Sequence, residues 1–514
     1  MSPKAKDDPV KMLYISAEGV LHFNGLSDEF QHINGKVTKF KNGGLADAAT
    51  SISDAFDGDE RFDRRRLLPG YTQKVMHDLE IDSSQFRRLT NEMQEHNVFF
   101  GRHRSFGLVP INERGVLKTY ENFDNSTQSI RAIALAGIVE NILSTSAVPY
   151  DVVWGHEGAA GLATAVARSH GIPTIGTNHN LHSVYVQQDE LERLASFDVE
   201  EVLPHLYFEH DSNRVDTLAT LLKDSTVTTV SEGFRNNILK RASHLHAPNY
   251  VFDLFDQAAN NPEKGFYGIS NAPINPDSEF LRAIETNGMD SVISNQEAAA
   301  KEFANKLGVE YDPELLTVAW INRIDPTQKN PGMYISAMSH FAKEMGVRAV
   351  MIADPVEGNQ ESRDLQKWAK NLSKNNPNFI YTPFGDGTLE PLAYQSKNVM
   401  TSLTSDYEPG GLPPINGGIL GTLSLVHAVD GLELVTAMDH QNNQGLGFPY
   451  WGQTLEGFQG ALHHAKNFSQ LPDEVQYAQK ERVAREILQK TTQDNIPQFR
   501  DIAYRVGMSH RNNS

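Results

Sequence analysis

Cysteine is absent from the 514 residues of the chain, which excludes disulfides, thiolate metal sites and cysteine nucleophiles. This absence fits a reducing compartment. Long apolar runs are also missing: the stretch from Ala132 to Val139 falls far short of the roughly 20 residues that span a bilayer. The N-terminal residues contain no apolar segment of the length found in a signal peptide. We therefore expect a soluble, cytoplasmic protein with no membrane partner.

Positive charge is scarce: 46 Lys and Arg residues stand against 65 Asp and Glu residues, a formal net charge of -19. Such a surface repels polyanions, so nucleic acid is not an expected partner. Any anionic ligand must meet a locally positive pocket. The apolar fraction of 39% is that of an ordinary folded protein, and 514 residues are too many for one hydrophobic core. We expect about two to four domains.

Short runs rich in Val, Ile and Leu alternate with longer segments of helical periodicity. This alternation is typical of parallel strands that helices cover on both faces. Strands are expected within residues 11–18, 65–71, 150–156, 172–179 and 225–231, and again within residues 315–323, 347–354, 378–384, 398–405 and 423–429. The pattern predicts an α/β protein with two doubly wound, Rossmann-like sheets.

The expected domain boundaries follow from this repeated scheme. Residues 1–255 form the first domain and residues 256–480 the second, because Pro, Asn and Gly accumulate and periodicity fades between Ala247 and Pro276. Residues 481–514 are expected to form a C-terminal helix and tail that pack back toward the first domain. Because ligands of such sheets bind at the carboxyl ends of the strands, we expect the two domains to face each other across a cleft.

Two glycine-rich stretches are candidates for binding an anion. The first, KNGGLADAA, places Lys41, Gly43, Gly44 and Asp47 at the mouth of an expected helix. Its glycines allow a ligand to approach the backbone, the helix offers free amides, and the lysine adds positive charge. A plain strand-to-helix turn would explain the same glycines.

The second stretch, YEPGGLPPINGG, combines Glu408 with Gly410 and Gly411 ahead of a helix expected to begin at Pro413 or Pro414. Bare amides at a helix start suit a diphosphate. The carboxylate cannot bind that phosphate, so Glu408 is expected to reach the hydroxyl groups of a sugar. A surface loop rich in Gly and Pro is the alternative.

Two further stretches carry charged or titratable residues at strand ends. INRIDPTQKN delivers Arg323 and Lys329, which could neutralise a leaving diphosphate or lie on a solvated rim. In the first half, His156, Glu157 and His179 follow two strands. Their spacing matches no zinc motif, so buried, hydrogen-bonded histidines are expected and no metal is.

Taken in order, these stretches resemble the glycogen and starch synthases, retaining glycosyltransferases of the GT-B fold. KNGGLADAA is close to the K-T-G-G-L-A-D signature, with Asn42 in place of threonine. The remaining similar segments are YISAE, RRRLLPGY, DVVWGHE, TNHNL, TTVSEGF, GISNAPINP, NRIDPTQK and YEPGGLPPINGGILGTLSLV. The similarity extends over roughly residues 11 to 460. These segments follow one another in the same order as the motifs of the family, which supports the resemblance.

The resemblance implies a role for each matching residue. Arg323 and Lys329 would hold the diphosphate, Glu408 would contact the transferred glucose, and His179 would lie beside its anomeric carbon. The other residues expected to bind the nucleotide-glucose are Lys41, Gly43, Gly44, Asp47, Phe384, Gly410, Gly411 and Leu412, of which Phe384 would stack on the base. The family also implies retention of configuration through an ion pair, with neither a metal nor a separate cofactor.

Several positions depart from the family pattern. The interval from Arg323 to Lys329 is one residue longer than in the family. Either a bulge directs the side chain of Lys329 into the site, or Gln328 and Lys329 exchange roles. Pro413 and Pro414 replace residues with free amides. An insertion lies between Glu18 and Lys41. Two alternatives to glucan synthesis therefore stay open: transfer to a protein or small-molecule acceptor, and binding without catalysis.

Overall fold

The structure is a computed structural model that describes residues 8–16, 19–22, 27–33, 36–40, 49–50, 52–69, 79–95, 98–101, 125–146, 149–209, 212–270, 278–385 and 387–513. The chain divides into two compact units. The first unit comprises Met1–Val230, Ile238–Ile274 and Asn495–Ser514, and the second comprises Ser231–Asn237 and Asn275–Asp494.

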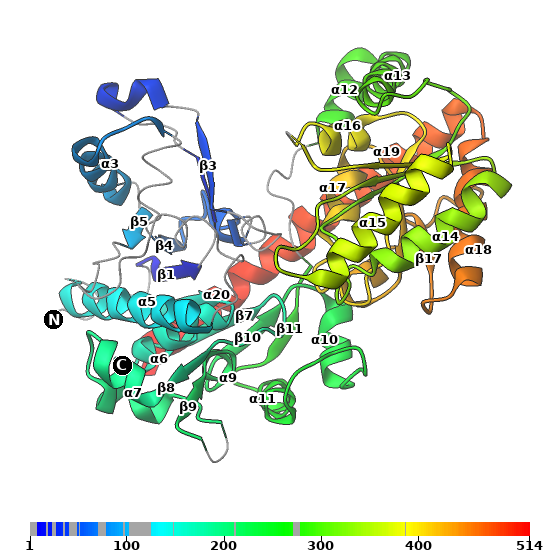
Figure 1. Cartoon of the computed structure of the whole chain (residues 1–514). Helices are drawn as coiled ribbons and strands as arrows, with labels where there is room; N and C mark the ends of the chain where they lie inside the picture. The colour runs from blue at the N-terminus through cyan, green and yellow to red at the C-terminus, as the bar shows by residue number, and fades with distance from the viewer. Residues whose placement is uncertain are drawn as a thin grey trace. The chain divides into compact units, whose positions relative to one another are not determined.

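The first unit is built on a seven-stranded sheet in the order β11-β10-β7-β6-β1-β4-β5, in which every strand pair is parallel (Figure 1). The strands are β1 (Val10–Ser16), β4 (Phe62–Pro69), β5 (Val98–Gly101), β6 (Val152–His156), β7 (Thr174–Asn178), β10 (Thr226–Thr229) and β11 (Phe266–Gly268). All residues of β1 are buried, as a strand covered on both faces requires. Two antiparallel ribbons accompany the sheet: β2 (Gly19–His22) with β3 (Val37–Phe40), and β8 (Tyr185–Gln187) with β9 (Arg214–Asp216).

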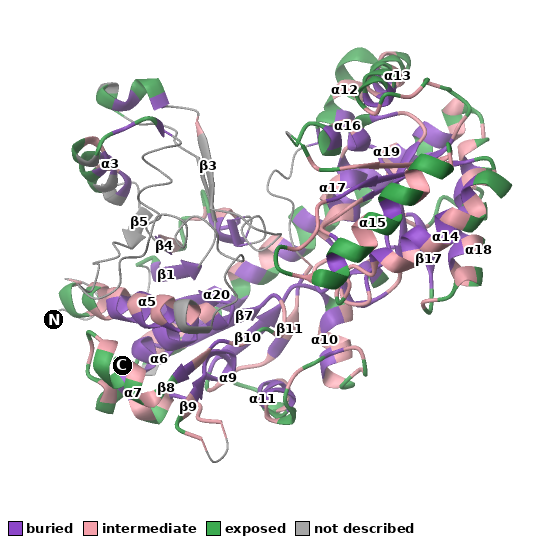
Figure 2. Cartoon of the chain, in the orientation of Figure 1, coloured by how far each residue is buried: buried purple, intermediate pink, exposed green. Residues whose placement is uncertain are grey.

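Helices cover both faces of this sheet. They are α3 (Ser83–Glu95), α5 (Asn125–Thr145), α6 (Gly161–Ser169), α7 (Gln188–Leu194), α8 (Val199–Val202), α9 (Thr217–Leu222), α11 (Asn249–Asn260) and α20 (Ile496–Asn513). Helix α6 is buried along almost its whole length beneath α5 and α9 (Figure 2). The opposite face receives α20, whose Phe499, Ile502 and Val506 pack with Trp154 on β6. The end of the chain therefore completes the first core.

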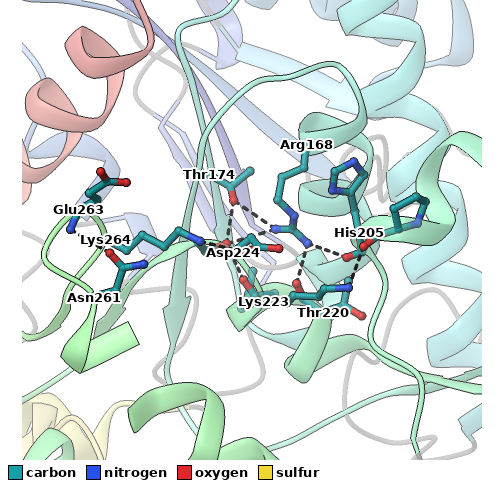
Figure 3. Close-up of polar contacts among 12 residues, drawn as sticks. Arg168, Thr174, His205, Thr220, Lys223, Asp224, Asn261, Glu263 and Lys264 are labelled. Carbon is teal, nitrogen blue, oxygen red and sulfur yellow. Dashed lines mark hydrogen bonds and ion pairs between the residues drawn. The ribbon is translucent and has the colours of Figure 1, made fainter. Parts of the chain in front are cut away.

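Arg168, near the end of α6, is a buried cation that connects several elements of the first unit (Figure 3). Its guanidinium donates to the hydroxyls of Thr174 and Ser225, each at 3.2 Å, and to the carbonyls of His205 at 3.1 Å and Thr220 at 2.7 Å. Burial lowers the pKa of Arg168 to about 10, so the side chain keeps its charge at neutral pH. It thus joins α6 to the N-terminal ends of β7 and β10 and to α9.

The second unit has a six-stranded parallel sheet in the order β14-β13-β12-β15-β16-β17. The strands are β12 (Thr317–Ile321), β13 (Arg348–Ile352), β14 (Phe379–Thr382), β15 (Val399–Leu403), β16 (Ser424–His427) and β17 (Phe448–Tyr450). Its helices are α12 (Glu279–Asn287), α13 (Met289–Lys306), α14 (Pro331–Glu344), α15 (Gln360–Asn375), α16 (Leu389–Gln395), α17 (Leu412–Ile419), α18 (Leu455–Ser469) and α19 (Asp473–Gln489). Trp320, Tyr334, Phe379 and Phe458 are fully buried in its core. Helix α10 (Glu232–Leu239) begins in this unit and ends in the first.

All ten expected strands are confirmed. Three short strands of the parallel sheets, β5, β11 and β17, and the four strands of the antiparallel ribbons, β2, β3, β8 and β9, were not expected. The expected crossing between Ala247 and Pro276 is wrong in part, because α11 and β11 of the first unit lie there. Val251, Phe252 and Phe255 bury one face of α11, a helical spacing that outweighs the surrounding Asn and Pro. Helix α11 thus runs through the expected boundary at residue 255, and the main passage between the units follows at Ile274–Asn275.

Candidate functional site

Glu408 and Lys329 lie together after two neighbouring parallel strands of the second unit, β15 and β12. The Nζ atom of Lys329 forms an ion pair with Oε2 of Glu408, and the side chains are only 13% and 11% exposed. The same Oε2 accepts a hydrogen bond of 2.9 Å from the hydroxyl of Ser405. Two residues expected at the site from the sequence are therefore adjacent, at the carboxyl edge where α/β sheets bind ligands.

A turn built on Asp325 accounts for the longer interval before Lys329. The carboxylate of Asp325 accepts hydrogen bonds of 3.1 Å from the amides of Thr327 and Gln328, and its carbonyl accepts one of 2.9 Å from the amide of Lys329. Asn330 then adopts a left-handed conformation and caps α14. The lysine side chain thus reaches Glu408, whereas Gln328 contributes its carbonyl to the amide of Asp406 at 3.0 Å.

Arg323 and Phe384 take different positions in the second unit. Arg323 follows β12, is half-buried and has no ion-pair partner within the described part of the chain, so its charge is available to an anion. Phe384 packs against the cluster of apolar residues around Val350 and Leu389. Its amide donates to Asp354 at 3.3 Å. Its ring therefore contributes to the core of this unit in the structure.

The stretch around Gly410 and Gly411 lacks side chains because it lies close to a second segment of the chain, at Gly431. Gly411 has a φ of +59° and caps α17, and a Cβ atom there would lie 2.7 Å from the carbonyl oxygen of Gly431. Helix α17 begins at Leu412, one residue before the earliest expected start. The amides of Gly410, Gly411 and Leu412 have no hydrogen-bond partner among the described residues. Pro413 and Pro414 have no N–H, so the free donors end at Leu412.

In the first unit, His156 and His179 form a buried pair. A hydrogen bond of 2.8 Å joins Nδ1 of His156 to Nε2 of His179, as expected of buried histidines. Glu157, at a φ of 64°, accepts hydrogen bonds from the amides of His179 at 2.6 Å and Asn180 at 2.9 Å. Burial lowers the pKa of His179 to about 3, and burial together with His179 and Arg66 holds the pKa of His156 well below its usual value. Both rings are neutral at pH 7.

The expected anion-binding residues Lys41, Gly43, Gly44 and Asp47 lie outside the described residues. Among the described residues, no group of three His, Asp or Glu side chains is placed to hold a metal ion. None of the helices in the described ranges combines the length and apolar character that a bilayer span requires.

The structure adds residues that the sequence did not single out. Ser405 lies three positions before Glu408 in the loop after β15, so its proximity in sequence was a usable signal. Gln453, after β17, donates to the carbonyl of Thr404 at 2.8 Å and supports the same loop. Asp430 accepts the amide hydrogen of Glu408 at 3.1 Å. No sequence motif relates Gln453 or Asp430 to Glu408.

The comparisons with known proteins agree with this geometry. A family model described as the starch synthase catalytic domain matches residues 36–247. A glycogen synthase from Pasteurella multocida is 24% identical over 417 residues, which cover 76% of this chain and 81% of that protein. The catalytic domain of starch synthase IV from Arabidopsis thaliana, solved with ADP and acarbose, superposes with a TM-score of 0.70 at 16% identity and covers 97% of this chain and 99% of its own. A glycosyltransferase structure from Rickettsia africae gives a TM-score of 0.52 at 12% identity, covering 96% and 99%.

Two doubly wound parallel sheets, together with the superposition on starch synthase IV, give the chain the GT-B fold. The matched domain and the curated relative then indicate the class of enzyme, a glycosyltransferase. Residues 36–247 match the starch synthase catalytic domain, and the chain is similar to the glycogen and starch synthases.

Proposed function

We propose that the chain is a retaining glycosyltransferase that transfers glucose from ADP-glucose or UDP-glucose to an α-1,4-glucan such as glycogen. The observation that carries the proposal is the group formed by Glu408, Lys329 and the free amides that end at Leu412. It offers a carboxylate for sugar hydroxyls beside donors for a diphosphate. The ADP and acarbose bound to the starch synthase IV structure support both ligand classes.

The diphosphate would be held by Arg323 and by the amides of Gly410, Gly411 and Leu412. Lys329 already faces a carboxylate, so a phosphate oxygen would share its ammonium with Glu408. Two cations and fixed main-chain dipoles stabilise the charge that develops on a departing nucleoside diphosphate. In the segments that the structure leaves undescribed, Lys41, Gly43, Gly44 and Asp47 are proposed to contact the phosphate end of the donor.

The transfer step would depend on placement of the sugar and on charge stabilisation. Glu408 would accept hydrogen bonds from the glucose hydroxyls while the acceptor hydroxyl attacks from the face that the diphosphate leaves. The leaving phosphate would take the proton of the acceptor. His179 would contact the sugar as a neutral hydrogen-bonding group, because the pKa of its buried ring is about 3. Neither a metal nor a cofactor is invoked, and stacking of Phe384 on the base would require its ring to leave the apolar cluster.

One observation favours a second candidate, transfer to an acceptor other than a glucan. Part of the insertion between Glu18 and Lys41 forms the ribbon of β2 and β3, with a short 3-10 helix, Asp28–Ile33, between them. An added structural element of this kind can change which acceptor is bound, since function is set by sites grafted on a fold.

The test is the release of nucleoside diphosphate by the purified chain from ADP-glucose and UDP-glucose, with and without glycogen. Release that depends on glycogen and is matched by incorporation of glucose into the glucan supports the proposal. Release that needs a cell extract instead of glycogen supports another acceptor. Tight nucleotide binding without release under any of these conditions overturns catalysis.

A further inference from the structure

The main chain of Glu408 is held on both sides by a second segment of the same unit. Its amide donates to Oδ2 of Asp430 at 3.1 Å, and its carbonyl accepts from the amide of Gly431 at 2.9 Å. The side chain is held separately, by Ser405 and Lys329. A glutamate whose carboxylate must accept hydrogen bonds from sugar hydroxyls in one orientation needs both its main chain and its carboxylate group to be fixed.

Asp430 is itself an unusual residue to find in this place. It is fully buried and has a φ of 48°, a region that residues other than glycine rarely adopt. Its second oxygen, Oδ1, accepts a hydrogen bond of 3.0 Å from the side-chain amide of Asn237. The two oxygens therefore connect Asn237 to the amide of Glu408 through one buried carboxylate.

The first turns of α10 fix Asn237 against this segment. Ser231 caps the helix by accepting from the amide of Phe234 at 3.0 Å, and its hydroxyl donates to the carbonyl of Pro409 at 2.6 Å. A Cβ atom on Gly233 would lie 2.0 Å from the carbonyl oxygen of Asp430, so a glycine is required there. Residues about 180 positions away in sequence thus hold the loop that carries Glu408, within one compact unit.

We propose that Asn237 and Asp430 are positioning residues that set the orientation of Glu408 for glucosyl transfer. The inference rests on the proposed function, because it assigns Glu408 to the sugar. In this role neither residue would touch the substrate. Asn237 supplies the hydrogen-bond donor that orients the carboxylate of Asp430, and Asp430 then fixes the amide of Glu408.

The decisive variants exchange the polarity of the pair. In Asn237→Asp, a second carboxylate faces Asp430, so repulsion replaces the hydrogen bond. In the double variant Asn237→Asp with Asp430→Asn, the new asparagine donates to residue 237 and still accepts from the amide of Glu408. The exposed side chain of Glu433, 3.3 Å from Asn237, can turn away into solvent. Asn236→Asp is the control, since it adds the same charge on the same helix next to this contact.

We expect Asn237→Asp to lower kcat about tenfold to a hundredfold with little change in KM for the nucleotide-glucose or in nucleotide affinity. The double variant should recover most of the loss, and Asn236→Asp should match the wild type. Hydrogen–deuterium exchange of the peptide that contains Glu408 should be faster in Asn237→Asp than in the wild type. It should be close to the wild-type rate in the double variant and in Asn236→Asp. If Asn237→Asp does not fold, Asn237→Ala removes the donor without adding charge and is compared with the wild type in the same assays.

Unchanged kcat and unchanged exchange at Glu408 in Asn237→Asp would overturn the inference, as would a loss that the double variant leaves in place. The exchange measurement needs no turnover. If the wild type releases no nucleoside diphosphate from any donor, the proposed function fails, while exchange at Glu408 still decides whether Asn237 and Asp430 hold that loop.

Discussion

At the scale of single residues, the ion pair of Glu408 and Lys329 is the feature on which the site depends. Both side chains are almost removed from solvent, so each charge relies on the other. In such surroundings an interaction between charges is less screened by water than at the surface. Under the proposed function, a ligand phosphate would enter a site in which the positive charge of Lys329 is already partly balanced, and Arg323 would supply the additional positive charge.

The first prediction concerns Glu408→Gln. Glutamine keeps the size of the side chain and can still accept from Ser405, but it leaves Lys329 without its anion. We expect folding to be retained, kcat for glucosyl transfer to fall about a hundredfold, and the melting temperature to fall because a buried charge loses its partner. Steady-state assays and thermal denaturation measure both effects. The exposed Glu456→Gln is the matched control, and equal rates for the two variants would remove Glu408 from the site.

The second prediction concerns the buried histidine pair. The pKa of His179 is about 3 in the folded protein and about 6.5 when unfolded, so the unfolded chain takes up a proton first as the pH falls. The stabilising contribution of the neutral ring is complete above about pH 6.5 and declines as the pH drops toward 3. The melting temperature should therefore fall less steeply between pH 7 and 5 in His179→Asn than in the wild type. His340→Asn, at an exposed position, should keep the wild-type slope; equal slopes in all three proteins would contradict the assignment.

At the scale of secondary-structure elements, apolar runs were enough to locate the long buried strands, because a parallel strand buried on both faces is apolar at nearly every position. The strands that escaped prediction have three or four residues and lie at the sheet edges, as β5 and β17 do. A run of three or four residues is too short to show the periodicity of apolar positions from which a strand is predicted. The turn at Asp325 was equally hidden, since only the structure shows how one extra residue is accommodated before Lys329.

The third prediction concerns the contacts of Arg168, which join α6 to its neighbours (Figure 3). In Arg168→Met the apolar part of the side chain is kept, whereas the carbonyls of His205 and Thr220 lose their donor. Each buried acceptor left unsatisfied costs about 1–3 kcal/mol. We expect a clearly lower melting temperature, with Arg168→Lys intermediate because it retains the charge but fewer donors. Arg193→Met, at an exposed position on α7, should be close to wild type, and a similar result for Arg168→Met would show that the buried contacts contribute little.

At the scale of the whole molecule, each unit is completed by residues from a distant part of the chain. Helix α20 covers the first sheet, and Ser231–Asn237 belong to the second unit. The sequence predicted the two sheets, and its resemblance to a known family placed Glu408 and Lys329 in one site. That β12 and β15, the strands before them, are neighbours is a finding of the structure. The sequence could not predict the contact of Asn237 with Asp430, since no local pattern relates residues 193 positions apart. Tertiary packing alone determines such a pair.

The last prediction tests how closely α20 approaches the first sheet. Replacing a glycine in a helix by alanine stabilises the helix by up to about 1 kcal/mol when the new methyl group meets only solvent. Gly460 in α18 is such a position, because nothing lies within 4 Å of an added Cβ atom. At Gly507 in α20 the added Cβ atom would lie 2.5 Å from Cγ1 of Val10 on β1. Overpacking of that kind costs about 1–3 kcal/mol, more than the gain in helix propensity.

Gly507→Ala should therefore lower the melting temperature of the protein, and Gly460→Ala should leave it unchanged or raise it. Hydrogen–deuterium exchange should locate the destabilisation in α20 and β1 for Gly507→Ala only. If both variants were stabilised, α20 would not lie as close to β1 in solution as the contact between Gly507 and Val10 requires. The first core would then be formed without the end of the chain.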